Sequence, residues 1–391
     1  MEIGIDKIGF YTPHMYVDMN KLAVARNDEP EKYTIGIGQE KMAVPPVTQD
    51  AVTLAANAAM EILDEADKEK IDLVIFATES GIDHSKAAAI YVHHLLGLNS
   101  GARAVEMKEA CYGATAGIQM AKGHISLHPD RKVLVLGADI SRYGLHTPGE
   151  VTQGAGAVAI LMSADPRVMV LEKESAYHTE DIMDFWRPLY SETAFVQGKY
   201  SVEKYNGFFK TVWEDYKKKT GLALKDFAAI CFHLPYTKQG LKALRLVVDE
   251  GNAADKERLL AHFEISKQYN KVVGNIYTGA LYLSLLSLLE LNTSIEAGAR
   301  IGLYSYGSGA VGEFFSGILQ PNYRDSLHVR HHEEMLSGRK EVSVQEYEAL
   351  FNQVLPADGS NIELPVDDDP APVCLSGIKD HMRIYVNKNQ S

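Results

Sequence analysis

The amino-acid sequence predicts one order of elements that occurs twice along the chain. Apolar runs and helical periods predict four elements in the first half: a buried strand at 73–77, a small-residue helix at 113–123, a buried strand at 133–137 and a glycine-punctuated strand at 154–161. The second half repeats them: a strand at 228–232, an apolar helix at 278–291, a strand at 301–306 and a glycine turn at 307–312. This α/β rhythm constrains the fold more than any single motif does.

The spacing of matching residues indicates an internal duplication. Glu79 ends its strand as His233 ends its own strand 154 residues later, and Gly156 precedes Ala-Val as Gly309 does 153 residues later. Two copies that each bury a sheet between helices would stack face to face. A length of 391 residues also fits two domain-sized units.

We expect an N-terminal half at 1–165 that carries the nucleophile and a C-terminal half at 166–391. Residues from about 166 to 206 are interpreted as an insertion near the active site, because Arg187-Pro188, Gly198 and several tyrosines interrupt the repeat there. Long segments of this kind inside compact domains are usually lids or binding segments.

The composition excludes several classes of protein. A formal net charge of -13 argues against general binding to nucleic acid or to an anionic membrane, since both need a basic face. We expect a cytoplasmic protein, because the first residues lack a basic and apolar leader and no stretch has the length of a membrane span. Three scattered cysteines predict no disulfide framework. No GxGxxG or GxxxxGK[ST] motif supports a nucleotide-dependent reaction.

Cys111 is the first candidate for chemistry, since it directly precedes the small-residue helix. A thiol at a helix N-terminus has its thiolate stabilised by the dipole and by free N–H groups, so we expect a lowered pKa. The alternative is a buried cysteine that acts as a small apolar residue.

Glu79 and His233 end matching strands, and a pseudo-twofold relation would bring these strand ends to one junction. An acid and an imidazole could then face the same nucleophile. Taken singly, Glu79 could be a solvated loop acid and His233 a structural histidine. Asn275 precedes the helix that matches the Cys111 helix, and its amide could donate to an oxyanion or cap the helix. Ser308, in the second glycine turn, has the same two interpretations.

Lys238, Lys242 and Arg245 fall at helical spacing just after His233. On an acidic protein they predict a phosphate-binding face, with a solvated helix face as the alternative. The cluster of His328, His331, His332, Glu333 and Glu334 predicts no metal site, because adjacent histidines point in different directions and the segment is polar enough to face solvent.

The sequence resembles the 3-hydroxy-3-methylglutaryl-CoA synthase family, especially its bacterial, mevalonate-pathway form, over nearly the whole chain. Four segments carry the resemblance: 32–39 (KYTIGIGQ), 109–113 (EACYG), 186–201, and Gly274-Asn275 together with 306–309 (YGSG). The resemblance implies a five-layer αβαβα sandwich of the thiolase fold, usually a homodimer. It also implies condensation of acetyl-CoA with acetoacetyl-CoA, with the thioesters as substrates and no cofactor or metal.

By the same resemblance, Cys111 would carry the acetyl group, Glu79 would be the general acid/base and His233 would contact acetoacetyl-CoA. Two further sets follow: residues that line the acyl site, Tyr143, Thr152, Ser201, Asn275 and Ser308, and residues that meet the CoA phosphates, Lys238 and Lys242. The family's site also uses an acidic residue just before the 32–39 segment. In this sequence Glu29 and Pro30 stand in that loop.

Two rival functions remain at this point. A ketoacyl-acyl-carrier-protein synthase III has the same fold but uses a Cys-His-Asn set, so Glu79 and the insertion speak against it. A noncatalytic acyl-CoA-binding protein is the other alternative, and an intact set of Cys111, Glu79 and His233 speaks against that.

Overall fold

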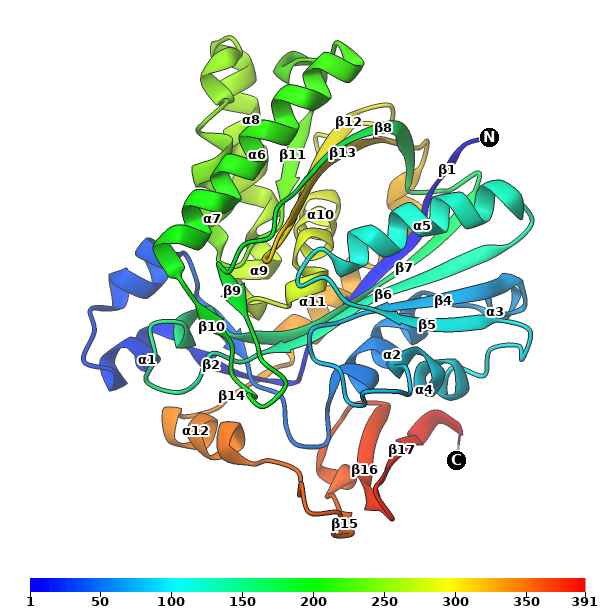
Figure 1. Cartoon of the computed structure of the whole chain (residues 1–391), viewed down its shortest axis with the longest axis vertical. Coiled ribbons are helices and arrows are strands. Elements are labelled where there is room, and N and C mark those ends of the chain that lie inside the picture. The colour runs from blue at the N-terminus through cyan, green and yellow to red at the C-terminus, as the bar shows by residue number, and fades with distance from the viewer. Residues whose placement is uncertain (391) are drawn as a thin grey trace.

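The protein was analysed as a computed structural model that describes residues 1–390. Its main sheet has nine strands in the order β11-β12-β13-β8-β1-β7-β6-β4-β5 (Figure 1). Their bounds are β1 Ile3–Tyr11, β4 Ile71–Ala77, β5 Arg103–Met107, β6 Lys132–Ser141, β7 Gly154–Ala164, β8 Met169–Thr179, β11 Ala229–Phe232, β12 Arg300–Gly307 and β13 Val311–Leu319.

Three small sheets and the helices complete the fold. The small sheets are formed by β2 Met15–Asp18, β3 Lys41–Ala43 and β14 Lys340–Glu341; by β9 Phe185–Trp186 and β10 Phe195–Val196; and by β15 Ile362–Glu363, β16 Val373–Lys379 and β17 Met382–Asn387. The helices are α1 Met19–Ala25, α2 Ala51–Ile62, α3 Glu65–Lys70, α4 Ala88–Leu95, α5 Gly113–Leu127, α6 Gly198–Thr220, α7 Thr237–Leu244, α8 Ala253–Ser266, α9 Gln268–Val273, α10 Ala280–Leu291, α11 Val329–Ser337 and α12 Val344–Asn352.

The strand pairing confirms the predicted duplication. In the first half β4 runs parallel to β6, and β6 runs antiparallel to β7; in the second half β11, β12 and β13 pair in the same way. Matching positions also share their backbone. Ala110 and Tyr277 each lie three residues before the first residue of α5 and α10, and each has a positive φ, 39° and 42°.

The two half-sheets are joined along one edge, which the sequence did not predict. Strands β1 and β8 pair at Gly4–Val170 and Ile5–Met169, so nine strands form one continuous sheet that spans both halves. The junction depends on Gly4, because a Cβ there would lie 1.9 Å from the Met169 carbonyl oxygen.

Helices α5 and α10 form the central layer between the two half-sheets (Figure 1). Helix α5 packs on β4, β6 and β7, while its Thr115 and Gln119 side chains reach Ser305 and Glu313 on the other half-sheet. Helix α10 is buried on all sides as far as Glu290, as expected for a helix enclosed by protein. With α2 on the outer face of one half-sheet and α6 on that of the other, the predicted five-layer thiolase fold is confirmed.

Small residues let α5 approach its sheet closely. A Cβ added to Gly117 would lie 3.0 Å from the Ile75 side chain and 3.1 Å from Val135. The small residues of α5 therefore determine how closely this helix, and with it the Cys111 turn, lies against the sheet.

The segment predicted as an insertion is narrower than expected. Strand β8 (Met169–Thr179) lies inside it and pairs with both β1 and β13 in the main sheet, while α6 begins at Gly198. The connecting part is therefore residues 180–197, which hold the β9–β10 hairpin. The division of the chain at residue 165 falls between β7 and β8 and stays a prediction.

The prediction that the histidine-rich segment faces solvent is wrong for His332. This side chain is fully buried; its Nδ1 lies 2.8 Å from Glu290 and its Nε2 lies 2.8 Å from Glu61. One face of α11 packs against the core, so polar residues that are neighbours in the sequence of this helix differ in burial. In residues 1–390 no group of histidine, cysteine and carboxylate side chains has the geometry of a metal site, and no helix there is long and apolar enough to cross a membrane.

Candidate active site

Cys111 lies in a tight turn just before α5, as predicted. Tyr112 occupies the N-cap position without a side-chain capping bond, and Ala110 has the positive φ that non-glycine residues rarely adopt. The opposite half of the protein presses on this turn, because a Cβ at Gly307 would lie 2.6 Å from the Glu109 carbonyl oxygen. The turn is thus fixed between the two halves.

Glu79 contacts the nucleophile directly. The Cys111 thiol donates a hydrogen bond to Glu79 Oε1 over 3.0 Å. Glu79 lies two residues beyond β4, and its backbone N–H donates to Asp139 Oδ1 over 2.7 Å. The acid and the nucleophile are therefore within reach for proton transfer.

Asp139, a buried residue of β6, holds this junction together. Its Oδ1 also accepts from the hydroxyls of Thr78 and Ser80, and its Oδ2 accepts from the backbone and the hydroxyl of Thr278 at 3.1 and 2.6 Å. One carboxylate thus fixes the Glu79 loop of the first half and the start of α10 from the second half.

The expected lowering of the Cys111 pKa by the helix dipole is wrong. Burial raises the pKa of Cys111 well above its ordinary value, and the neighbouring Glu79 carboxylate raises it further. Burial and the charge of Asp139 raise the pKa of Glu79 to about 8, against the opposing effects of the Cys111 hydrogen bond and of Arg187. A dipole acts only over the first turn, and here desolvation outweighs it.

His233 directly follows β11, at the position predicted from Glu79. It is buried, its Nδ1 has no hydrogen-bond partner within residues 1–390, and burial lowers the pKa of His233 to about 3, so the ring is neutral. Tyr205 packs at 6.5 Å from the His233 ring and lies within electrostatic reach of Cys111. Tyr205 thus lies between the His233 ring and the region of Cys111, and a shared site for His233 and Cys111 stays a prediction.

Asn275 serves as a local cap and keeps its amide group available. Its side-chain oxygen accepts the backbone N–H of Tyr277 over 2.9 Å, and the NH₂ group lies beside the Tyr143 hydroxyl. Tyr143 packs edge-on against Tyr277 and Phe185, and the charges of Cys111 and Glu79 raise the already high pKa that burial gives Tyr143. Asn275 and Tyr143 thus lie in the region of Cys111 and Glu79.

Ser201 and the Ser308 turn are tied together by Asp184. This fully buried carboxylate accepts from the hydroxyls of Ser201 (3.0 Å) and Tyr306 (2.9 Å) and from the Gly309 N–H (2.9 Å). Ser308 itself is partly exposed beside the Cys111 turn. Thr152 instead donates to the Gly149 carbonyl oxygen, so its contact with a substrate stays a prediction.

The predicted phosphate-binding lysines lie on α7. Lys242 donates to the Tyr236 hydroxyl over 2.8 Å, whereas the Lys238 ammonium has no partner within residues 1–390. The 32–38 segment adjoins this helix, since Thr237 donates to the Ile37 carbonyl oxygen. Glu29 and Pro30 lie in the preceding loop, where the carboxylate that binds Lys32 and Tyr33 is that of Asp28.

Asp139 and Asp184 were missed by the sequence analysis. Asp139 had a signal, because it is an acid within an otherwise apolar strand, a position where a carboxylate needs partners. Asp184 had no such signal in the sequence apart from its place in the 166–206 segment.

The fold and the contact between Cys111 and Glu79 define a class: a thiolase-fold condensing enzyme with a cysteine hydrogen-bonded to a glutamate. The sequence matches the family descriptions "Hydroxymethylglutaryl-coenzyme A synthase N terminal" over residues 1–167 and "Hydroxymethylglutaryl-coenzyme A synthase C terminal" over residues 250–358. The chain belongs to the hydroxymethylglutaryl-CoA synthase family.

Individual relatives agree with this assignment. The chain is 51% identical to the hydroxymethylglutaryl-CoA synthase of Enterococcus faecalis, over 99% of this chain and 100% of the relative. It is 30% identical to the polyketide biosynthesis 3-hydroxy-3-methylglutaryl-ACP synthase PksG of Bacillus subtilis, over 98% and 96%. A crystal structure of HMG-CoA synthase complexed with CoA superposes with a TM-score of 0.96 at 46% identity, covering 99% of this chain and 100% of the other.

Proposed function

We propose that this protein condenses acetyl-CoA with acetoacetyl-CoA and water to give 3-hydroxy-3-methylglutaryl-CoA and CoA, in the mevalonate pathway of isoprenoid synthesis. The observation that carries the proposal is the direct hydrogen bond between the Cys111 thiol and Glu79. It places a base beside a nucleophile, as a covalent condensation through acetyl-cysteine requires.

The first step acetylates Cys111. Glu79 receives the thiol proton, the thiolate sulfur attacks the acetyl-CoA carbonyl, and the C–S bond to CoA breaks. The departing CoA thiolate takes up this proton from Glu79, which returns to the carboxylate form. The Asn275 amide would donate to the tetrahedral oxyanion, because its NH₂ group has no hydrogen-bond partner within residues 1–390.

The second step forms the carbon–carbon bond. The Glu79 carboxylate removes a proton from the methyl group of acetyl-Cys111, and the resulting enolate carbon attacks the ketone of acetoacetyl-CoA. His233, neutral because burial lowers its pKa, donates a hydrogen bond to the new alkoxide, which becomes the 3-hydroxyl group on protonation. Water then cleaves the thioester, which releases the product carboxylate and restores the thiol.

Binding of the two thioesters is assigned to both halves. Lys238 and Lys242 would meet the CoA phosphates from α7, and Tyr143, Thr152, Ser201 and Ser308 would line the acyl site, with Glu29 and Pro30 at its outer loop. Every bond change in the scheme uses side chains of this chain, so we propose no resident cofactor or metal and treat the CoA thioesters as substrates.

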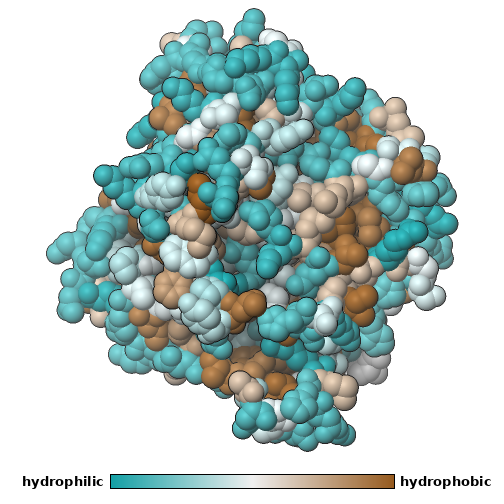
Figure 2. Space-filling view, viewed as in Figure 1, coloured by the Kyte–Doolittle hydropathy of each residue, from teal (hydrophilic) through white to brown (hydrophobic). Residues whose placement is uncertain are grey.

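We propose that the enzyme is a homodimer and that it acts in the cytoplasm. Strand β5 lies at the sheet edge with Val105 exposed, so a second copy could pair with it about a twofold axis. Figure 2 shows apolar residues gathered at the right of the molecule, over the region of β5 and α5. All three cysteines are free thiols, as expected in a reducing compartment.

Free CoA release from acetyl-CoA plus acetoacetyl-CoA tests the function. We expect CoA release with both substrates and an acetyl adduct on Cys111 with acetyl-CoA alone. An acyl-carrier-protein donor is the second candidate, because one relative is named as an ACP synthase. Condensation from acetyl-ACP but not from acetyl-CoA would favour it, whereas no condensation from either donor would overturn the proposed activity.

A further inference from the structure

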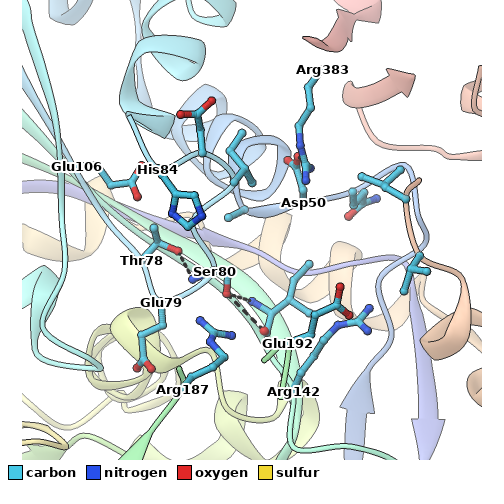
Figure 3. A pocket seen from close by; sticks show the side chains of 18 of the residues that line it. Asp50, Thr78, Glu79, Ser80, His84, Glu106, Arg142, Arg187, Glu192 and Arg383 are labelled. Atoms are coloured by element: carbon cyan, nitrogen blue, oxygen red, sulfur yellow. Dashed lines mark hydrogen bonds and ion pairs between the residues drawn. The ribbon is translucent and has the colours of Figure 1, made fainter. Parts of the chain in front are cut away.

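A cavity of about 1060 Å³ opens beside Glu79. Glu79 is part of its wall, while Cys111 is not, so the glutamate has the thiol on one side and the cavity on the other. Arg187 is also part of the cavity wall; Figure 3 shows its guanidinium near the Glu79 carboxylate in projection, and its charge acts on that carboxyl. The general base of the proposed reaction therefore has a cationic neighbour on the side away from the nucleophile.

Arg187 is held by a rigid support. It directly follows β9, whose Trp186 stacks on Phe195 of β10 with ring centroids 5.7 Å apart. Three residues earlier, buried Asp184 anchors the same segment through Tyr306 and Gly309. The hairpin that the sequence marked as a binding segment thus places one arginine beside Glu79.

The guanidinium is not used by any other group. Arg187 forms no hydrogen bond or ion pair with another side chain of residues 1–390. The other arginines of the cavity are engaged, since Arg142 donates to the Phe351 carbonyl oxygen and Arg383 pairs with Asp50. A half-buried guanidinium without a hydrogen-bond partner loses part of its hydration, and a nearby carboxylate offsets that cost.

The surroundings of Glu79 are otherwise acidic or neutral. The groups that face it are Asp139 on β6, Cys111 and Glu109 in the turn before α5, Tyr143 after β6, Tyr277 before α10, and Arg187 after β9. Arg187 is the cation among them. Hydrolysis of the thioester adds one more carboxylate at this place, which increases the need for a positive charge.

We propose that Arg187 is a positioning residue for the general base, whose positive charge, acting across the cavity without a direct ion pair, increases the ionised fraction of Glu79 for abstraction of the acetyl methyl proton. This inference rests on the proposed function of Glu79. The charge of Arg187 lowers the pKa of Glu79 against burial, in agreement with this role. Arg187 acts through Glu79 and touches no reacting atom in the proposed scheme.

The test compares Arg187→Gln, Arg187→Lys and the control Lys86→Gln, which removes one positive charge from the same cavity at a residue that packs on Tyr91. The pH profile of condensation is measured for each, after circular dichroism has verified the fold. Loss of a nearby opposite charge raises a carboxyl pKa by about 1 unit, so Arg187→Gln should move the rising part of the pH–rate profile to higher pH. The condensation rate at pH 7 should fall about tenfold. Arg187→Lys keeps the positive charge, so its pH–rate profile should lie close to that of the wild type.

Infrared difference spectra make the result independent of the activity. The protonated and ionised forms of Glu79 absorb at different frequencies, and the band is assigned by its loss in Glu79→Gln. If the wild-type enzyme fails to condense, the proposed function fails, yet an upward shift of this band's midpoint in Arg187→Gln still supports the electrostatic role. An unchanged midpoint, or an equal shift in Lys86→Gln, would overturn it.

Discussion

The Cys111 thiol donates to Glu79 Oε1 over 3.0 Å, and this contact acts on the two groups in opposite directions: it makes the thiol harder to ionise and the carboxyl easier to ionise. The carboxylate raises the pKa of the thiol, and burial with Asp139 raises the pKa of the carboxyl to about 8. The carboxyl therefore ionises before the thiol does, so an ionised Glu79 can accept first the thiol proton and later a proton of the acetyl methyl group.

Replacing Glu79 by glutamine should separate these two steps. Glutamine keeps the size and cannot accept the thiol proton, but it removes the charge that raises the Cys111 pKa, so the acetyl adduct should still form from acetyl-CoA with water as the proton acceptor. Condensation should fall by about 10²–10⁴-fold, because the methyl proton loses its base. Mass spectrometry measures the adduct and formation of 3-hydroxy-3-methylglutaryl-CoA measures condensation; a near-normal condensation rate would make Glu79 a structural acid.

The rate of condensation should rise with pH. Glu79 is a base only when ionised, and its pKa of about 8 means that the ionised fraction increases from pH 6 to pH 9. Single-turnover reaction of preformed acetyl-Cys111 with acetoacetyl-CoA isolates this step. A rate that is flat across this range would contradict the raised pKa.

The same shift predicts a cost in stability. A carboxyl whose folded pKa is raised above its ordinary 4.5 stabilises the folded state fully below pH 4.5, and this contribution is lost as the pH rises to about 8. Glu79→Gln should therefore melt at a higher temperature than the wild type at pH 8, with the difference shrinking towards pH 4.5. Equal melting temperatures at both pH values would refute this linkage.

Lys238 and Lys242 should differ in their effect on binding. CoA phosphates lie far from the reacting carbon, so alanine at either position should raise KM more than it lowers kcat. Lys238 has a free ammonium while Lys242 already binds Tyr236, so Lys238→Ala should have the larger effect, and high salt should reduce both. Exposed Lys225 provides a matched alanine control, and equal KM values in all three proteins would exclude a phosphate site here.

The sequence was sufficient for the features that depend on local pattern or on repetition. Glu79, His233 and Cys111 were found because strand ends and helix starts recur at fixed spacing. Strand β8 was missed because its burial alternates irregularly and includes the charged residues Glu172 and Lys173, so its place is set by pairing with β13. The direction of the Cys111 pKa was wrong because a helix start is a local feature, whereas burial and Glu79 come from distant parts of the chain.

His332 offers a prediction that is separate from catalysis. Burial lowers the pKa of His332, but hydrogen bonds to Glu290 and Glu61 outweigh burial and raise the pKa to about 9. His332→Gln would leave two carboxylates in the core without their cation, and breaking a buried pair in this way typically lowers the free energy of unfolding by about 3–5 kcal/mol. Exposed His94 gives the matched glutamine control, which should leave stability unchanged.

The pH dependence distinguishes this charge cluster from simple packing. A histidine whose folded pKa is raised above 6.5 stabilises the fold fully below pH 6.5, and that contribution is lost as the pH rises through about 9. The difference in unfolding free energy between the wild type and His332→Gln should therefore be largest near pH 6 and smaller at pH 9.5, while acetylation of Cys111 at low temperature is unchanged. Denaturant titrations at the two pH values measure this difference. A difference that is independent of pH would mean that His332 acts through its shape, with no contribution from its charge.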